Sequence, residues 1–313
     1  MKKYFFIFLL FAQTGFTQQP VRDTSFNIQS TYLKEVKTRP YIKIAAPSFF
    51  KNTVSEYNIA YRNIGGRELL LDIFYSKDKS TKKPAVLLIF GGGWKSGDKT
   101  HNYAMAAELV KNNYVAISAE YRLSPEAIYP AAVFDLKAAI RWIKANANKY
   151  GIDASHIAMM GTSAGGQLAA LIGTTNNNHQ FEDTIGNKKY YSKIQAAIDI
   201  DGILAFKHPE SQEAASASLW LGGDYEHTRE NWEQASALNH VDKNTVPFLF
   251  LNSSNLRFHA GRDDMIKKMN ELKIYSEVHE FPDTPHPFWF FHPWFDPMMK
   301  YSIDFLNKVF KNK

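Results

Sequence analysis

Short apolar runs and longer segments with helical periodicity alternate along most of this 313-residue chain. The apolar runs are the expected strands, at 85–90, 114–120, 157–160, 194–200, 247–251 and 276–281. The segments with helical periodicity are 103–111, 129–147, 164–173, 263–272 and 297–310. This alternation predicts a mostly parallel central sheet with helices on both faces. The ligand of such a sheet binds beyond the carboxyl ends of its strands. The polar segment 174–193 is expected to be a surface insertion beside that site.

The chain is expected to divide into a leader, an arm and one large domain. Lys2 and Lys3 precede an apolar run, 4–12, that is too short to span a bilayer, so residues 1–17 are predicted to be a cleaved signal peptide. An N-terminal membrane anchor is the alternative. Residues 18–56 show no clear period and are expected to be an irregular arm packed on the domain, 57–313. We therefore expect a secreted or periplasmic bacterial protein with no membrane span in its mature form.

Composition narrows the class of protein further. Hydrophobic residues make up 45% and charged residues 22%, which suits a globular core rather than disorder. The chain has no cysteine, which excludes disulfides and thiol catalysis. The net charge of +6 is spread along the chain without a basic stripe. This favours anionic partners such as acidic polysaccharides and argues against nucleic acid.

One short motif follows an apolar run and precedes an Ala-rich helical segment. Residues 161–165 read Gly-Thr-Ser-Ala-Gly and match Gly-x-Ser-x-Gly. In the strand–turn–helix context, this motif lifts the serine hydroxyl above the sheet and places it at a helix N-terminus. The alternative is a tight turn with an incidental serine. The context favours Ser163 as a nucleophile.

Three glycines, 91–93, follow the apolar run that ends at Phe90. Glycine lets the backbone approach a ligand closely, and the N–H groups can bind an oxyanion together with that of Ala164. A phosphate loop would need Gly-Lys-Ser/Thr, and Trp94 stands where that sequence should begin. The glycines are therefore interpreted as part of an oxyanion hole.

Together these motifs resemble the lipase and esterase branch of the α/β-hydrolases, which carries His-Gly-Gly-Gly-Trp. The similar stretches are Phe-Gly-Gly-Gly-Trp at 90–94, Glu-Tyr-Arg-Leu-Ser-Pro-Glu at 120–126, the serine motif, Leu-Gly-Gly at 221–223 and Ala-Ser-Ala-Leu at 235–238. The resemblance implies that Gly92 and Gly93 are the oxyanion donors. The family usually has His where this chain has Phe90, so a different packing must hold the loop. The Phe form resembles bacterial carbohydrate esterases, including pectin methyl- and acetylesterase-like proteins.

The fold implied by the resemblance orders its triad as Ser, acid, His, with the His after the last strand. His286 follows the expected strand 276–281 and is the favoured base, ahead of His292. The family usually places the acid in the loop after the seventh strand, but residues 252–262 contain no carboxylate. Asp201, which ends the preceding strand, is the favoured acid. Asp263 or Asp264, at the start of the next helix, is the alternative.

The loop without a carboxylate carries Arg257, His259 and Arg262 instead. Arginine matches the planar geometry of a carboxylate, so these residues and Trp94 are expected to contact a substrate that can bear a uronate. The alternative is a structural ion pair with Asp263 or Asp264.

We therefore predict a secreted serine esterase that hydrolyses acetyl or methyl esters on polysaccharide fragments, pectic ones among them, through an acyl-enzyme. No metal or organic cofactor is expected. The rival interpretations are an exopeptidase of the same fold and a non-catalytic carbohydrate-binding protein that keeps the fold. Fold alone does not separate acetyl from methyl esters or identify the sugar.

Overall fold

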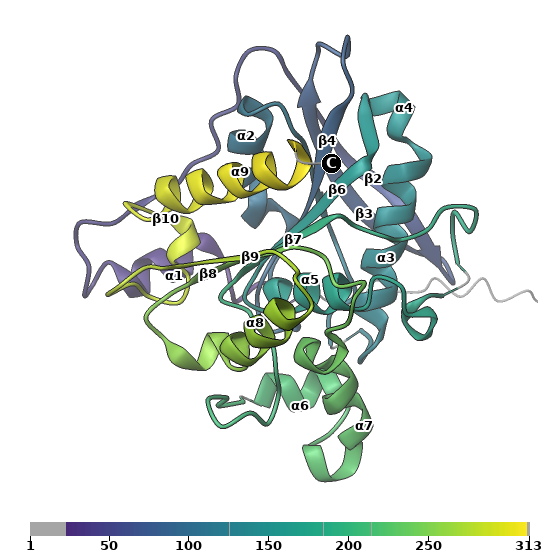
Figure 1. The fold of residues 1–313 in the computed structure, drawn as a ribbon. Helices are drawn as coiled ribbons and strands as arrows, with labels where there is room; N and C mark the ends of the chain where they lie inside the picture. Colours follow the sequence, from purple (N-terminus) through teal and green to yellow (C-terminus); the bar gives the residue numbers. More distant parts are fainter. Residues whose placement is uncertain (1–22, 125, 184, 214, 312–313) are drawn as a thin grey trace, which may run out of the picture.

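The computed structural model describes residues 23–124, 126–183, 185–213 and 215–311, so the expected signal peptide lies outside the described residues. An 8-stranded sheet crosses the molecule in the order β2-β3-β5-β4-β6-β7-β8-β9 (Figure 1). In chain order its strands are β2 (Thr53–Ile64), β3 (Arg67–Ser76), β4 (Lys83–Ile89), β5 (Val115–Ala119), β6 (Ile152–Thr162), β7 (Ala196–Ile200), β8 (Phe248–Asn252) and β9 (Ser276–Glu280). Strand β3 is antiparallel to both of its neighbours, and every pair from β5 to β9 is parallel. The sheet is mostly parallel, as predicted.

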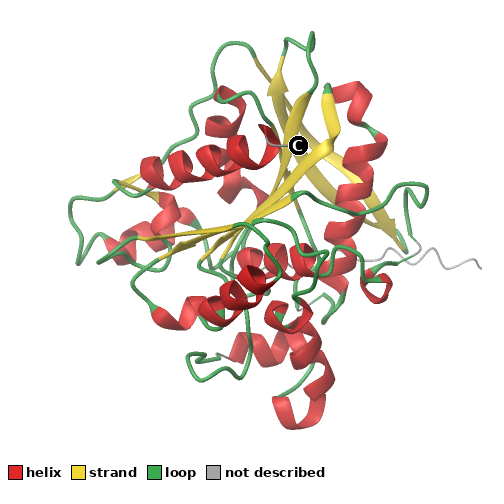
Figure 2. Cartoon of the chain, in the orientation of Figure 1, coloured by secondary structure: helices red, strands yellow, loops and turns green. Residues whose placement is uncertain are grey.

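Helices cover both faces of this sheet (Figure 2). Helices α2 (Tyr103–Lys111) and α9 (Phe295–Lys311) pack on one face, and α3 (Ala131–Ala145), α5 (Ala164–Thr174) and α8 (Arg262–Glu271) pack on the other. The remaining helices are α1 (Ile28–Glu35), α4 (Ala147–Tyr150), α6 (Ala215–Leu221) and α7 (Tyr225–Ala235). The fold is that of an α/β-hydrolase, as the sequence predicted.

Strand β4 shows why the sequence folds into these layers. Its side chains alternate between the two faces, because successive residues of a strand point to opposite sides. Leu87 and Ile89 enter the core under α3 and α5, while Val86 and Leu88 enter the core under α2 and α9. All four are fully buried, which explains the unbroken apolar run in the sequence.

The segment 18–56 is more ordered than the sequence indicated. Its described part contains α1 and a short strand, β1 (Lys43–Ile44), which pairs with β10 (Phe291–His292) near the other end of the chain. Phe26 and Tyr32 pack against the core under α9. The arm therefore joins the domain through both hydrogen bonds and apolar contacts.

Two elements between β7 and β8, α6 and α7, were not predicted from the sequence; they lie at the bottom of the view in Figure 1. The expectation that segment 174–193 lies beside the ligand site is wrong. This segment follows the C-terminus of α5, whose N-terminus faces the carboxyl edge of the sheet, so it emerges at the opposite edge. There Glu182 and Asp183 bind Arg141 of α3, at 2.8 Å each.

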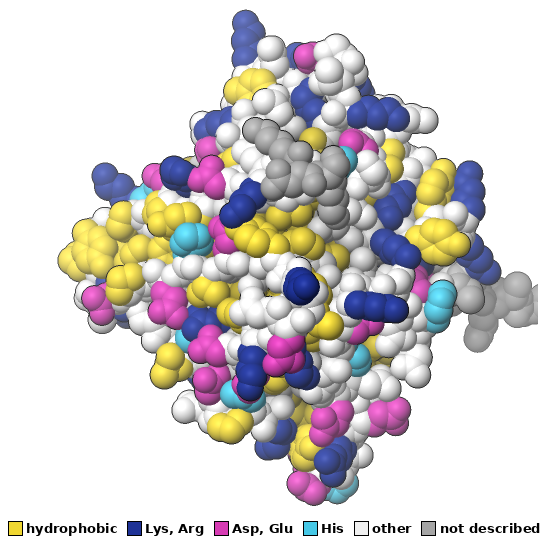
Figure 3. All heavy atoms as spheres, in the orientation of Figure 1, with side chains coloured by type: hydrophobic (Ala, Val, Ile, Leu, Met, Phe, Trp, Pro, Cys, Tyr) yellow, Lys and Arg dark blue, Asp and Glu magenta, His cyan; other side chains and the backbone are white. Residues whose placement is uncertain are grey.

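Charged side chains of both signs are interspersed over the face seen in Figure 3. Within the described ranges, no helix combines the length and the apolar character that a membrane crossing requires.

Candidate active site

Ser163 occupies the turn between β6 and α5, at the carboxyl edge of the sheet. Its φ of 53° and ψ of −119° are strained for a residue with a side chain, and its N–H donates to the Ile200 carbonyl at 2.8 Å. The turn is so tight that a Cβ on Gly161 would lie 2.0 Å from the Gly165 carbonyl oxygen. The flanking glycines are therefore a steric requirement of this turn.

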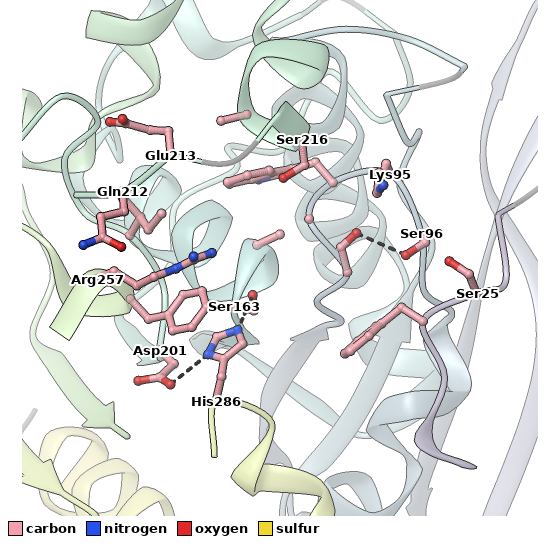
Figure 4. A pocket seen from close by; sticks show the side chains of 18 residues that line it. Ser25, Lys95, Ser96, Ser163, Asp201, Gln212, Glu213, Ser216, Arg257 and His286 are labelled. Carbon is pink, nitrogen blue, oxygen red and sulfur yellow. Dashed lines mark hydrogen bonds and ion pairs between the residues drawn. The ribbon is translucent and has the colours of Figure 1, made fainter. Parts of the chain in front are cut away.

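His286 stands between Ser163 and Asp201 (Figure 4). Its Nε2 lies 2.9 Å from the Ser163 Oγ, and its Nδ1 lies 2.9 Å from the Asp201 Oδ2. The imidazole reaches the site from the loop after β9, and its side chain is 20% exposed. If Nδ1 carries the proton and donates it to Asp201, Nε2 is free to accept the Ser163 proton.

Asp201 directly follows the last residue of β7, Ile200, and is fully buried. Its second oxygen, Oδ1, accepts the Ser253 N–H at 2.7 Å, which fixes the carboxylate plane from the tip of β8. The other candidate acids lie elsewhere: Asp263 pairs with Arg262 at 2.8 Å, and Asp264 contacts His208 at 3.1 Å. The structure thus brings Asp201, the acid favoured from the sequence, to His286.

The alternative base, His292, takes no part in this arrangement. It lies just beyond the 3₁₀ turn 288–290, whose three aromatic residues are buried, and its Nδ1 lies 3.1 Å from Asp296 of α9.

Two aromatic rings confine His286, and sequence reasoning missed both contacts. The Phe258 ring is stacked on the imidazole, with 3.3 Å between centroids and 12° between planes. The Trp289 ring meets it edge-on at 5.0 Å and 89°. The available signal was the position of Phe258 in the loop after β8, beside Arg257. These rings limit how far the imidazole can rotate away from Ser163.

The glycine loop after β4 lies next to Ser163. Gly92 and Gly93 have φ values of 131° and 60°, a region that residues with a side chain rarely adopt. Among the described residues, their N–H groups donate to no backbone or side-chain oxygen. The N–H of Ala164 belongs to the first turn of α5, where helical partners are lacking. The three residues predicted to supply the donors line the same pocket as Ser163.

Phe90 shows how the loop is held without the usual histidine. Its ring is fully buried and stacked on Tyr121, at 4.6 Å between centroids. The Tyr121 hydroxyl donates to the Phe90 carbonyl at 3.0 Å. After the glycines, the Ser96 N–H donates a hydrogen bond to the Gly92 carbonyl at 3.1 Å. An aromatic stack and a closed turn hold the two ends of the loop.

A second buried carboxyl group, that of Asp199, lies on β7 two residues before Asp201. Burial, and next the negative charge of Asp201, raise the pKa of Asp199 well above its usual value. Its Oδ1 accepts the Gly202 N–H at 2.9 Å, while Oδ2 is buried and has no hydrogen-bond partner among the described residues. A protonated Asp199 avoids placing two negative charges beside each other under the site.

The pocket over Ser163 has a volume of about 300 Å³. Of the predicted substrate contacts, Trp94 and Arg257 line it, and Figure 4 shows Arg257 beside the serine. Trp94 is nevertheless mostly buried, because it stacks on Trp220 at 4.7 Å and donates to Gln167 at 3.0 Å. Its main contribution is to the packing beneath the pocket.

His259 and Arg262 differ from the prediction, because neither lines this pocket. Arg262 is buried and donates to Asn252 at 2.9 Å and to Glu280 at 2.7 Å, besides its contact with Asp263. Burial, and then the charge of Arg262, lower the pKa of His259, so its ring is neutral near pH 7. Arg262 therefore forms a structural ion pair, which was the alternative interpretation, and is not a substrate contact.

This arrangement provides a hydroxyl nucleophile, a base in contact with it, a buried carboxylate behind the base and backbone donors beside it. These groups are those required to transfer an acyl group through a covalent intermediate. Within the described ranges, no group of three or more His, Asp and Glu side chains is placed to hold a metal ion.

Comparison with known proteins agrees with this geometry. The sequence profile of the BD-FAE family matches residues 71–268. The chain is 34% identical over 193 residues to the esterase LipC of Mycobacterium tuberculosis, covering 59% of this chain and 47% of LipC. It is 26% identical to LipM of the same organism, a probable carboxylic ester hydrolase, over 76% of this chain and 57% of LipM. The chain thus spans about half the length of these curated relatives.

A solved structure, a truncated form of a carbohydrate esterase from gut microbiota, superposes with a TM-score of 0.71 at 27% identity, covering 84% of this chain and 98% of that one.

Proposed function

The chain belongs to the BD-FAE family, and on that premise we propose that it is a serine ester hydrolase that acts on small esters of polysaccharide fragments. The single observation that carries this proposal is the contact of His286 with both Ser163 and Asp201, at 2.9 Å each. Relatives named as esterases support the same reaction class.

In the proposed reaction, the Ser163 Oγ attacks the ester carbonyl carbon while His286 accepts the hydroxyl proton. The N–H groups of Gly92, Gly93 and Ala164 hold the negative oxygen of the tetrahedral intermediate. The carbon–oxygen bond to the alcohol then breaks, and His286 gives its proton to the departing oxygen. Water attacks the acyl-enzyme with the same histidine as base, which releases the acid and restores the serine hydroxyl.

The proposed substrate is a saccharide, and an anionic one. The name of the structural neighbour, a carbohydrate esterase, supports a sugar ester. Arg257 lines the pocket, its Nε is buried without a partner, and no ion pair is recorded for it within the described residues. A guanidinium that forms no ion pair with a described carboxylate, at the edge of an ester site, suits a uronate such as those of pectin.

We also propose that residues 1–17 are a signal peptide and that the mature protein works outside the cytoplasm, where polysaccharide fragments occur. Lys2 and Lys3 before the apolar run 4–12 support this proposal. The proposed domains are an arm at 18–56 and the hydrolase domain at 57–313, and residues 53–56 of this arm already belong to strand β2 of the sheet.

The function is tested with a panel of acetylated and methyl-esterified glycans, an aryl acetate and an aminoacyl anilide, with wild type and Ser163→Ala. We expect release of acetate or methanol by wild type and no turnover by Ser163→Ala, whose melting temperature should match. Hydrolysis of the anilide alone would indicate an exopeptidase, and no turnover of any substrate would indicate a binding protein.

Arg257 is tested by Arg257→Gln on the same panel. If it binds a uronate, KM should rise for pectic esters more than for the neutral aryl acetate. Arg262→Gln is the matched control, since Arg262 lies outside the pocket. Equal effects of Arg257→Gln on both substrates would assign it a structural role.

A further inference from the structure

A second hollow adjoins the site, and nothing in the proposed mechanism uses it. Its volume is about 620 Å³, larger than the pocket over Ser163. Helix α1 forms one wall, with Ser30, Thr31 and Lys34 among the lining residues. The two hollows share Phe26, Arg257, Phe258 and His286 as lining, so they meet at the imidazole.

The chemistry of the reaction fixes which part of an ester this hollow can take. The oxygen of the departing alcohol must lie within hydrogen-bond reach of His286 Nε2 to receive its proton. Gly92, Gly93 and Ala164, which hold the carbonyl oxygen, do not line the second hollow. The carbonyl group therefore stays over Ser163, and an alcohol whose oxygen lies near His286 can extend past the imidazole along α1.

The charged lining of this hollow favours an anion. Lys34, Arg39 and Arg257 line it together with one carboxylate, that of Glu35. Glu35 binds Arg39 at 2.8 Å, one turn away. Lys34 is exposed, and no ion pair is recorded for it or for Arg257 within the described residues. Two cations thus line the hollow, one from α1 and one from the loop after β8.

The described polar groups around these cations suit a sugar. Ser30 and Asn255 add an hydroxyl and an amide to the lining, and Phe26 and Phe258 add two aromatic rings. Phe258 is itself covered by the Arg257 guanidinium, 4.5 Å from its centroid. Because His286 and Arg257 already cover the Phe258 ring, Phe26 is the ring that can contact an apolar face of a saccharide, while the polar groups bind its hydroxyls.

We propose that the hollow along α1 is the alcohol subsite, and that it binds an anionic oligosaccharide whose hydroxyl carries the ester. The inference rests on the proposed function and narrows it: the sugar is the alcohol and the acyl group is small, as in an acetylated oligouronide. A methyl ester of the uronate has the opposite arrangement, because its alcohol is methanol and leaves the hollow empty. The N-terminal arm is then a part of the substrate site.

The test compares Lys34→Gln and Lys34→Glu with Lys37→Gln, an exposed control just beyond α1 that does not line the hollow. Each variant is assayed on acetylated oligogalacturonide, methyl-esterified oligogalacturonide, acetylated xylo-oligosaccharide and p-nitrophenyl acetate. For acetylated oligogalacturonide we expect KM to rise about two- to fivefold in Lys34→Gln, as for one exposed charge pair, and further in Lys34→Glu. The values of kcat, and KM for p-nitrophenyl acetate, should not change.

At high salt, the difference in KM for acetylated oligogalacturonide between wild type and Lys34→Gln should become smaller, because salt screens exposed charges. A second readout is the binding of deacetylated oligogalacturonide to Ser163→Ala by calorimetry, which Lys34→Gln should weaken by a similar factor.

The outcomes distinguish a failure of this inference from a failure of the proposed function on which it rests. If wild type fails on every ester, the proposed function fails. If wild type hydrolyses p-nitrophenyl acetate but not acetylated oligogalacturonide, only the subsite inference is overturned. It is also overturned if Lys34→Gln changes KM for the neutral and anionic sugars equally, for the methyl ester alone, or no more than Lys37→Gln does.

Discussion

Asp201→Asn perturbs the buried contact behind His286 with little change in volume. The carboxylate now accepts at both oxygens: Oδ2 lies 2.9 Å from His286 Nδ1, and Oδ1 lies 2.7 Å from the Ser253 nitrogen. Asparagine offers one acceptor and one donor in the same space. With its carbonyl toward Ser253, its amide group donates to Nδ1 and drives the ring proton to Nε2. That nitrogen can then no longer accept the Ser163 proton.

The opposite rotamer restores the working tautomer but turns the amide group toward the Ser253 N–H. An unsatisfied buried donor costs about 1–3 kcal/mol, which is roughly 5- to 150-fold in population at ~1.36 kcal/mol per decade. In either rotamer the imidazolium also loses its carboxylate. We therefore expect kcat to fall by about 10³–10⁴-fold, the upper figure being that of a serine protease with the equivalent change.

The assay is kcat for p-nitrophenyl acetate, measured on protein whose melting curve shows that it is folded. Asp263→Asn and Asp264→Asn are the matched controls, and they should alter stability rather than kcat. The reasoning is refuted if Asp201→Asn keeps kcat within tenfold of wild type, or if either control loses more activity than Asp201→Asn.

Three further changes test the surroundings of the site. Phe258→Leu removes the ring stacked on His286. It should lower kcat for p-nitrophenyl acetate by about tenfold or more with little change in KM, because small misplacements of reacting groups slow the reaction. An effect on KM alone would contradict this positioning role. Asp199→Asn mimics the protonated carboxyl group. Burial raises the pKa of Asp199 in the folded state above its value of about 4 in the unfolded chain. The stability of wild type should therefore fall relative to this variant as the pH rises from about 4 through the folded-state pKa. Melting temperatures of the two proteins that differ by the same amount at every pH would contradict this prediction. Arg262→Gln loses the hydrogen bonds to Asn252 and Glu280 and should lower the free energy of unfolding by about 1–2 kcal/mol in chemical denaturation. Its KM for pectic esters should equal that of wild type. A higher KM would indicate that Arg262 contacts the substrate.

The layered sheet could be predicted because its strands are buried on both faces. The runs that became β4 and β8 are apolar except at one end, and the run that became β7 is interrupted only by Asp199. Segments with helical periodicity separate these runs. Position along the sheet edge also indicated Asp201, because β7 and β8 are neighbours whose tips adjoin. The predicted range of β6 was too short, since it starts at Ile152 in a half-polar stretch whose pattern resembles a loop.

Orientation within short turns could not be predicted. Arg257 and His259 share one 3₁₀ turn, 256–259, yet Arg257 lines the pocket and His259 is buried. A run of basic residues carries no period long enough to say which side chain faces the site. Helix α1 was missed for another reason: its apolar side chains pack against residues far away in sequence, as Tyr32 does against Phe291.

The central claim is that Ser163 carries the acyl group during turnover. Wild type can be mixed with p-nitrophenyl acetate, quenched in acid within the first turnover, digested and analysed by mass spectrometry. We predict that the peptide containing Ser163 gains the mass of one acetyl group, that nitrophenol is released in a burst of one equivalent per enzyme, and that Ser163→Ala shows neither. Steady ester turnover with no acetylated Ser163, or turnover by Ser163→Ala at a rate near that of wild type, would contradict the claim.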